Sequence, residues 1–564
     1  MPQTPHSRVI RDLADAHVDA LTEIDPFQAT WLGLRDDRMR DLSPAGQEAM
    51  DARLHQTLAE LDKLTGDSTD DIADADERRC AQLLRDRLTS ELAVSESGEH
   101  FRAVRNILGP LQSLRGVFSM MPTATEDDWG LIARRMAKVP DAVAGYRATL
   151  TEGARRGMFA APLQVNTQTD QIAAWAAAGD GRGWFADLAS GAEVSAALRG
   201  DLDTAAAAAI EAFTDLSTWL RTDYLPRAEG TPDGVGAERY AVQVRWFSGA
   251  DLDLAEAYEW AWSEYRRLAA EEREQADRVL PGATMAEAVD HLDAHGDVVA
   301  GVERIRERLQ DVIDRTLVEL DGTHFDMTDQ MRRVECRIAP PGSAAAPYYT
   351  RPSRDFSRPG RTWLPVDGRT EFPMWRLLTT WYHESVPGHH LQLGYWTTRA
   401  DKLSVFQTNI GSVSAMSEGW ALYAERLMDE LGYFSDPGTR LGFLDAQMRR
   451  AIRVIIDIGM HLGLPIPADS PVGAGERWNH ELGLAMLRHG SPRDDGFVTS
   501  EVVRYLGVPA QAIGYKLGER AWLAGRAAAQ QARGAAFDLK AWHMAALSLG
   551  SLGLDDLTGE LARL

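Results

Sequence analysis

The residues best suited to chemistry lie in one short segment, TTWYHESVPGHHLQ, at 379–392. It contains three histidines, and Glu384 directly follows the first of them, His383. In zinc proteases, a His-Glu-x-x-His sequence places two imidazoles one helical turn apart on one face, with the glutamate beside them as a base. The segment therefore indicates a metal centre. A hydrogen-bonded helix junction is the alternative, and it would be the better interpretation of a lone histidine.

Pro387 stands where the second histidine of that pattern belongs. Proline lacks a backbone N–H and clashes with the carbonyl four residues earlier, so a helix has to bend or bulge there, and Gly388 adds conformational freedom. If the two residues act as an insertion, His389 becomes the second ligand; if the bulge is wider, His390 does. In an unbroken helix, His390 would lie about 10 Å further along than His383, too far to share one ion. We favour His389 and keep His390 as the alternative.

A third ligand is expected on a separate helix downstream. The segment SEGWALYAERL, at 417–427, starts with Ser417 as a candidate N-cap and continues with strong helix formers. Glu418 lies at the start of this helix, where its carboxylate is either a metal ligand or simply favoured by the helix dipole. Beside the histidine motif we favour the ligand. Glu425, two turns further along, is expected to support the site from outside or to be structural.

Zinc is the expected ion, because two imidazoles and one carboxylate with an open position form a usual catalytic zinc site. Manganese and cobalt remain alternatives. Zinc polarises a bound water molecule and lowers its pKa toward about 7. Glu384 is next to a ligand without being one itself, so it is the natural general base to take a proton from that water.

Five further polar residues are candidates for supporting or substrate-binding roles. Asp457 and His461 are four residues apart on a predicted helix and share a face, so they can orient a ligand imidazole or contact substrate. A plain pair within the helix is the alternative. Gln392 is a candidate for the same supporting role. Arg504 and Lys516 are candidates for binding a substrate carboxylate, with surface placement as the alternative.

Helical periodicity dominates the elements that position these residues. Apolar residues recur every three or four positions between 441 and 463, and the alanine-rich run 204–224 also favours helix. Residues 332–338 alternate apolar and charged, which predicts a strand. The Pro/Gly-rich stretch 339–366 is expected to form loops with short strands. Its last part, RTWLPV at 361–366, could serve as an edge strand that binds an extended peptide.

The 564 residues exceed what one hydrophobic core usually serves, so two or more lobes are expected. Pro226 and the Gly/Pro stretch 230–236 break a predicted helix and give a boundary. We predict an N-terminal helical lobe at 1–235 and a catalytic metal-binding lobe at 236–564, with some interleaving of the two.

Composition excludes several classes of partner. The chain has 60 Lys and Arg against 84 Asp and Glu, a net charge of -24, and this field repels phosphate backbones and anionic lipid. No nucleic-acid partner is expected. Cys80 and Cys336 are the only cysteines and are expected to be small buried residues. No membrane span or secretory signal is found, which predicts a cytoplasmic location. The oligomeric state stays open.

Five segments resemble a large bacterial family known as domain of unknown function 885 (DUF885). They occur in the family's order, and YHESVPGHH is the most specific among them. The family is similar to helical zincin metallopeptidases of the thimet-oligopeptidase and Taq-carboxypeptidase type. This resemblance implies a mainly α, two-lobed fold with a few short strands beside a deep active-site channel. The segments are YYTRPSRDFSRPG (348–360), YHESVPGHHLQ (382–392), SEGWALYAERL (417–427), DIGMH (457–461) and VVRYLGVPAQAIGYKLG (502–518).

Two residues depart from the family pattern. Phe356 stands where the family often has the glycine of Asp-Gly-Ser-Arg-Pro-Gly, and Ala510 where it often has the glycine of Pro-Gly-Gln-Ala. Each change alters backbone freedom near the expected substrate side. By analogy with tyrosines that follow Pro-Gly turns in the resembling peptidases, Tyr515 is the first candidate to donate to a developing oxyanion, and Tyr348 or Tyr349 is the second. Packing is the alternative for each tyrosine.

Three functions are compatible with these residues. The leading one is a cytosolic zinc metallopeptidase that acts on short peptides, since a channel between helical lobes would exclude folded proteins. The second is a metal-dependent amidase or other hydrolase of a small metabolite. The third is a non-catalytic binding protein on a zincin scaffold, and the joint presence of His383, Glu384 and Glu418 argues against it.

Overall fold

The fold is taken from a computed structural model of the chain, and it is mainly helical, as predicted. The structure describes residues 8–66, 68–69, 71–178, 181–339, 346–366, 368–491 and 493–564. Residues 340–345 of the predicted loop stretch lie outside the described residues.

Helices make up most of the described chain, and its short strands lie between residues 298 and 373. The first helices are α1 (Val9–Ile24), α2 (Pro26–Trp31), α3 (Pro44–Thr65), α4 (Ala75–Glu96), α5 (Pro110–Met120), α6 (Glu126–Met136), α7 (Val139–Arg155), α8 (Pro162–Ala177), α9 (Trp184–Ser190), α10 (Ala196–Trp219) and α11 (Leu225–Ala228). The next are α12 (Ala237–Ser248), α13 (Leu254–Val279), α14 (Met285–His295), α15 (Val302–Leu320), α16 (Met374–Glu384), α17 (His389–Thr398), α18 (Ser414–Glu430), α19 (Pro437–Leu462), α20 (His480–Gly490), α21 (Asp495–Gly507), α22 (Gly514–Arg533), α23 (Leu539–Leu547) and α24 (Leu554–Arg563). Short 3-10 or π turns are η1 (Glu99–Arg102), η2 (Leu220–Tyr224), η3 (Phe406–Ile410) and η4 (Gly534–Ala536). The strands are β1 (Val298–Ala300), β2 (Val334–Ile338), β3 (Tyr348–Thr350), β4 (Gly360–Leu364) and β5 (Glu371–Pro373).

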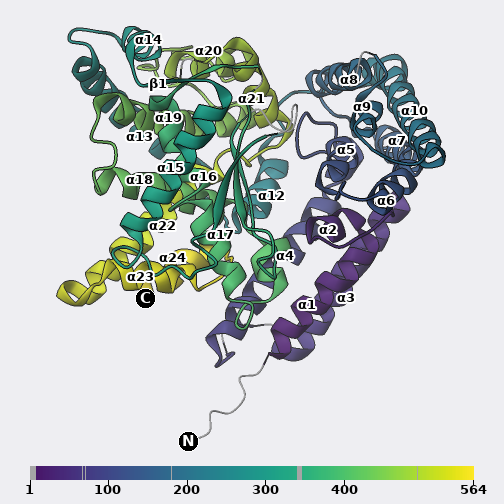
Figure 1. The fold of residues 1–564 in the computed structure, drawn as a ribbon, viewed down its shortest axis with the longest axis horizontal. Coiled ribbons are helices and arrows are strands. Elements are labelled where there is room, and N and C mark those ends of the chain that lie inside the picture. Colours follow the sequence, from purple (N-terminus) through teal and green to yellow (C-terminus); the bar gives the residue numbers. More distant parts are fainter. Residues whose placement is uncertain are drawn as a thin grey trace, which may run out of the picture.

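Two large hydrophobic cores divide the helices between them. The larger core combines buried side chains of α1, α3 and α4 with those of helices from α12 to α24. The smaller one is built by residues 104–228, mainly from α5 to α10. Figure 1 shows these helices grouped on one side of the molecule, with α1 and α3 below them. Helices from both sides of residue 235 therefore share the larger core.

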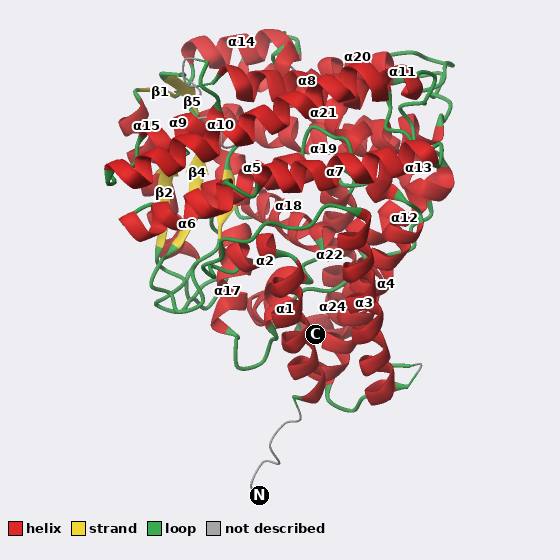
Figure 2. Ribbon diagram, turned by 90° about the vertical axis from the view of Figure 1, so that its right-hand side faces the viewer, coloured by secondary structure: helices red, strands yellow, loops and turns green. Residues whose placement is uncertain are grey.

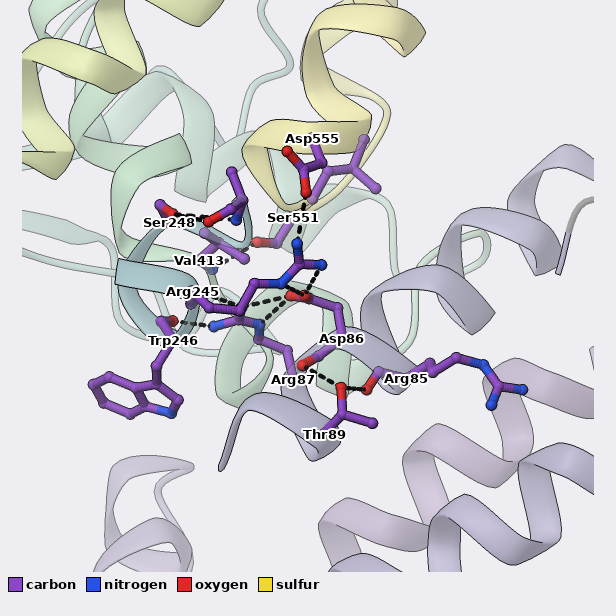
Figure 3. A network of polar contacts seen from close by, with 12 residues as sticks. Arg85, Asp86, Arg87, Thr89, Arg245, Trp246, Ser248, Val413, Ser551 and Asp555 are labelled. Atoms are coloured by element: carbon purple, nitrogen blue, oxygen red, sulfur yellow. Dashed lines mark hydrogen bonds and ion pairs between the residues drawn. The ribbon is translucent and has the colours of Figure 1, made fainter. Parts of the chain in front are cut away.

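Ion pairs join α4 and α12 to the C-terminal helix α24 (Figure 3). Arg245 donates from Nη2 to Asp86 at 2.6 Å and from Nη1 to Asp555 at 2.6 Å. Arg87 donates to the backbone carbonyl of Trp246. Because Asp86 and Arg87 are buried, these charge-assisted hydrogen bonds hold the N-terminal helices against the end of the chain.

Strand β4 is the centre of a three-stranded sheet in the order β2-β4-β3 (Figure 2). It is parallel to β2 and antiparallel to β3. Strands at 332–338 and 361–366 were expected and are present. The prediction that 361–366 offers a free edge to a peptide is wrong, because β4 is paired on both sides. The outer edge of β2 is also engaged: Gln310 of α15 accepts from the N–H of Cys336 at 2.7 Å and donates to the carbonyl of Val334 at 3.1 Å.

The helix predicted at 441–463 is confirmed as α19, which ends with Gly463 in a left-handed conformation (φ 60°). Nearly all of its side chains are buried, including most of the charged ones: Asp445, Arg449, Arg450, Arg453 and Asp457. Cys80 and Cys336 are free and buried, as predicted. Within the described ranges, no helix has both the length and the apolar character needed to cross a bilayer.

Both residues that replace a family glycine have a left-handed backbone. Phe356 has φ 55° and Ala510 has φ 66°. Side chains with a Cβ are disfavoured there by roughly 1–2 kcal/mol relative to the right-handed region. The two departures noted in the sequence are therefore sites of local backbone strain.

A matched pair of alanines tests this strain. We expect Ala510→Gly to leave the free energy of unfolding within about 0.5 kcal/mol of its starting value, because relief of strain offsets the lost methyl contacts and the greater flexibility of the unfolded chain. Ala512 is also buried and has no positive φ, so Ala512→Gly should lose about 1–2 kcal/mol. Urea denaturation of both variants measures the difference. Equal losses would contradict the prediction.

Candidate metal centre

The segment 379–392 folds as two helices joined by a tight turn. Helix α16 ends at Glu384 and α17 begins at His389. The turn is fixed by Trp420, whose indole N–H lies 3.0 Å from the carbonyl of Pro387 and 3.1 Å from that of Gly388. A Cβ on Gly388 would lie 1.9 Å from the carbonyl oxygen of His383, so only glycine fits this turn. The Pro387-Gly388 interruption thus brings His389 beside His383.

Three side chains converge on one point. Single donor atoms of His383, His389 and Glu418 all lie within 4.8 Å of one another. Glu418 Oε2 is 3.3 Å from His383 Nε2 and 3.5 Å from His389 Nε2, and it has no hydrogen-bond partner among the described residues. Ligands held about 2.0–2.2 Å from a tetrahedral zinc ion are about 3.3–3.6 Å apart. The spacing and chemistry of the three donors therefore fit zinc.

The electrostatics of this group favour a cation. Burial alone would lower the pKa of His383, but its contacts with Glu418 and Glu425 raise it to about 9. Burial would raise the pKa of Glu418, but contacts with His383 and His389 hold it well below its usual range. Glu384, Glu418 and Glu425 surround the two imidazoles, and Arg450 compensates only Glu425, so the charge of the remaining carboxylates favours a cation between them.

Glu418 lies in the second turn of its helix rather than at the start. Helix α18 begins at Ser414, preceded by Val413, so the prediction of Ser417 as the N-cap is wrong. The helix dipole acts mainly within the first turn and gives Glu418 less support there. Its place beside two imidazoles is the stronger explanation for a partly buried carboxylate.

Glu425 contacts His383 on the Nδ1 side of the imidazole, away from the three converging donors. The imidazole Nδ1 of His383 donates to Glu425 Oε1 at 2.8 Å, so Nε2 is the nitrogen that faces the converging donors and would bind an ion in place of its proton. Thr379 donates to Glu425 Oε2 at 2.7 Å, and an Arg450 nitrogen lies 3.1 Å from Oε1. The supporting role expected for Glu425 agrees with these contacts. Sequence reasoning missed both of these partners. Thr379 could have been found, because it lies one helical turn before His383, whereas nothing in the sequence around Arg450 links it to the site.

Glu384 is next to the three donors without being one of them. Its side chain is partly exposed, whereas that of His383 is buried. Burial among protein atoms raises the pKa of Glu384, although the nearby charges of His383 and His389 act in the opposite direction. A carboxylate with increased proton affinity, reachable from solvent and adjacent to the donors, is suited to accept a proton.

Tyr515 lies against the same group. Its ring stacks on that of His383, with centroids 6.3 Å apart and planes at 19°. Burial, followed by the negative charge of Glu418, raises the pKa of Tyr515 to about 12, so its hydroxyl stays a donor. Helix α22 approaches α18 closely enough for this contact because Gly518 crosses Gly419: a Cβ on Gly518 would lie 2.8 Å from Gly419 Cα.

The structure does not bring His390, the alternative second ligand, to the three donors. Its Nε2 donates to the carbonyl of Met331 at 2.7 Å, and its Nδ1 accepts from the Tyr349 hydroxyl at 2.9 Å. Both nitrogens are therefore used, and burial lowers its pKa to about 4. Tyr349 is committed to this contact. The ring of Tyr348 stacks on that of Trp363, with the ring centroids 5.9 Å apart.

Asp457 and His461 are not brought to the ligands. Asp457 accepts from the Tyr240 hydroxyl at 2.7 Å and from the N–H of Ala510 at 3.1 Å. His461 donates from Nε2 to the carbonyl of Tyr505 at 3.0 Å. The pair therefore connects α19 to α12 and to the segment before Tyr515, and neither expected role at the metal agrees with these contacts.

The other predicted polar residues have mixed outcomes. Gln392 is fully buried, and its amide has no hydrogen-bond partner among the described residues. Arg504 donates to Glu501 at 2.9 Å, and Arg453 lies 2.6 Å from the same carboxylate, so two arginines share one negative charge. Lys516 is fully buried and lies 2.6 Å from Glu519 and 2.9 Å from Glu264, so its charge is compensated. A substrate-binding role does not agree with the contacts of Lys516, and for Arg504 it stays a prediction.

Asp457 should make stability depend on pH. Burial raises its pKa to about 7, so the folded chain keeps a proton that the unfolded chain releases above about pH 4. The free energy of unfolding should fall by up to about 4 kcal/mol from this group between pH 4 and 7 and then level off. Asp457→Asn should remove that fall, as measured by urea denaturation across this range.

Asp445, on the same helix, is the matched control. Burial raises its pKa, but the charges of Arg493 and Arg449 outweigh this and lower it overall. Its contribution therefore has the opposite sign: it is present above the unfolded pKa of about 4 and is lost as the pH falls through its folded pKa. An Asp457→Asn profile parallel to wild type between pH 4 and 7 would contradict the assignment.

Comparison with known proteins agrees with this fold. The family model described as "Bacterial protein of unknown function (DUF885)" matches residues 26–561. A candidate lipoprotein from Colwellia psychrerythraea superposes with a TM-score of 0.84 at 22% identity, covering 98% of both chains. A candidate lipoprotein of unknown function from Shewanella oneidensis gives a TM-score of 0.74 at 18% identity, covering 98% of this chain and 99% of that one. No curated protein matches the chain. At these identities, the two structures establish similarity of fold alone.

Proposed function

The chain belongs to the DUF885 family of bacterial proteins, and we propose that it is a zinc-dependent hydrolase, a metallopeptidase that cleaves short peptides. One observation carries this proposal. His383 and His389 each direct an Nε2 atom at Glu418 Oε2, at 3.3 and 3.5 Å, this oxygen has no hydrogen bond within the described part of the chain, and Glu384 is adjacent. A helix junction needs no such convergence, whereas a hydrolytic zinc site needs three donors and a base.

Three residues would hold the metal and a fourth would transfer the proton. His383, His389 and Glu418 would hold zinc, which when bound polarises water and a substrate carbonyl. Glu384 takes a proton from the attacking water and passes it to the leaving amine.

Two neighbours complete this assignment. Glu425 holds the His383 Nδ1–H and so fixes the imidazole's orientation. Tyr515 remains protonated because burial raises its pKa, and it can donate to the oxygen that gains charge.

Short peptides are proposed as substrates because the family is similar to helical zincin peptidases with an enclosed channel. The zincin type and the two-lobed channel belong to this proposal. An amidase acting on a small metabolite would use the same residues. A cytoplasmic location is also proposed, and the lipoprotein names of the two similar structures make an extracytoplasmic location the competing outcome. Cell fractionation with an antibody to the chain distinguishes the two locations.

A peptide mixture tests the proposed activity. Purified protein with added zinc is incubated with defined peptides of about 3 to 15 residues, and products are identified by mass spectrometry. We expect cleavage that is abolished by a chelator, restored by zinc, and absent from His383→Ala. Hydrolysis of small amides without any peptide cleavage would favour the amidase. No hydrolysis of either class by zinc-loaded protein would contradict the proposal.

A further inference from the structure

A cavity lies at the start of two parallel strands, β2 and β4. The register pairs Val334 of β2 with Gly360 of β4, so the residues before each strand are neighbours. Between them is a cavity with a volume of about 550 Å³, within the usual range for small-ligand sites. Its lining consists of Arg332, Arg333, Val334, Glu335, Ser357, Arg358, Pro359 and Arg361. We call it the Arg333–Arg358 pocket.

The pocket concentrates positive charge in a chain whose net charge is -24. Two of its four arginines are neutralised by neighbouring acids. Arg332 lies 2.6 Å from both Asp321 and Asp329. Arg361 lies 3.0 Å from Glu335, which is thereby engaged.

Arg333 and Arg358 are different. Neither guanidinium has an ion pair or hydrogen bond to the residues that the structure describes, and both side chains are exposed. Two positive charges therefore remain uncompensated, on opposite strand entries of one cavity. Together they give this cavity a local positive charge in an acidic protein.

The loop that carries Arg358 is held in place by its own polar groups. The N–H of Arg358 donates to Ser353 Oγ at 2.9 Å, and its carbonyl accepts from the N–H of Ser353 at 3.0 Å. Asp355 Oδ1 accepts from the hydroxyls of Ser353 and Ser357 at 2.7 and 2.8 Å. Partial burial and the charge of Arg361 lower the pKa of Arg358. The backbone that carries the Arg358 side chain is therefore held in place without a ligand.

We propose that the Arg333–Arg358 pocket binds a phosphate group, either inorganic phosphate or that of a small phosphorylated molecule. Two uncompensated guanidinium groups match a ligand with a charge near -2, as a phosphate has at neutral pH. Arginine presents a planar fork of N–H donors that suits phosphate oxygens. A single carboxylate would neutralise only one of the two charges. This assigns a role to the segment YYTRPSRDFSRPG, which the proposed hydrolysis does not use.

The site is distinct from the metal centre but adjoins it. Gly360 lies between the lining residues Pro359 and Arg361 and is so close to the Tyr349–His390 pair that a Cβ there would clash with the tyrosine hydroxyl. His390 is next in sequence to the proposed ligand His389. The strand that lines the pocket therefore packs against the helix that carries one ligand, while the lining includes none of the three ligands.

Calorimetric titration with inorganic phosphate at low ionic strength tests the proposal. We expect one phosphate per chain in the wild type. Arg333→Gln and Arg358→Gln should each weaken binding by about 10-fold or more, because each removes charge-assisted hydrogen bonds. Arg304→Gln, at an exposed arginine of α15 outside the lining, should stay within about 2-fold. Thermal unfolding confirms that each variant is folded.

The assignment would be overturned by no phosphate binding to the wild type, by unchanged binding to the Arg333→Gln/Arg358→Gln double variant, or by acetate binding as tight as that of phosphate. His383→Ala separates the two sites. Phosphate binding that persists in this variant supports a pocket apart from the metal, and binding that is lost with the metal would overturn the pocket while leaving the proposed hydrolase intact.

Discussion

Replacing Glu384 with glutamine is expected to reduce peptide hydrolysis by about 10²–10⁴-fold while leaving zinc content unchanged. Glutamine keeps the shape of the side chain but cannot accept the proton of an attacking water. Because Glu384 is not one of the three converging donors, the metal should stay bound. Kinetics on a cleaved peptide, together with elemental analysis of the same preparation, measure both quantities.

The substitution has a clear control and a clear contrary result. Glu371→Gln changes an exposed carboxylate on β5 and should leave both activity and zinc content unaltered. Hydrolysis that persists at near wild-type rates in Glu384→Gln would remove this residue from the role of base. A loss of zinc in that variant would instead make Glu384 a ligand.

His389→Ala and His390→Ala should behave in opposite ways although the two residues are adjacent. His389→Ala removes one of three donors, so zinc and activity should both be lost. His390→Ala leaves the donors in place but frees the Tyr349 hydroxyl and the carbonyl of Met331, which should lower the free energy of unfolding by roughly 1–3 kcal/mol. Zinc content and urea denaturation of both variants distinguish the two roles. Zinc loss from His390→Ala alone would reverse the ligand assignment.

The sequence predicts the parts of the site that depend on local spacing. His383 and Glu384 follow from one motif, and the effect of Pro387 on a helix is a backbone rule that holds in any fold. Strand β2 and helix α19 follow from their periods of two and of three to four residues. The choice between His389 and His390 could not be settled in this way, because it depends on how wide the turn is, and Trp420 of another helix fixes that turn.

Long-range contacts set the rest, and no local pattern indicates them. Arg450 contacts Glu425 from α19, a helix that does not belong to the histidine motif. The central place of β4 depends on β3 pairing with its other side, which short strands do not reveal. Asp457 and His461 have the spacing of a functional pair, yet each is used in packing between helices. The same four-residue spacing is compatible with a supporting contact at a metal or with a structural contact between helices. Which of the two occurs depends on the helices that pack against the pair.

Elemental analysis of protein purified without added metal tests the central claim most directly. The wild type should contain about one zinc ion per chain, or take up one when zinc is supplied, and Glu418→Gln should retain far less under the same conditions. A wild type that binds no zinc from either source, or a Glu418→Gln variant that binds it as tightly as wild type, would contradict the convergence of two imidazoles and a glutamate on one ion.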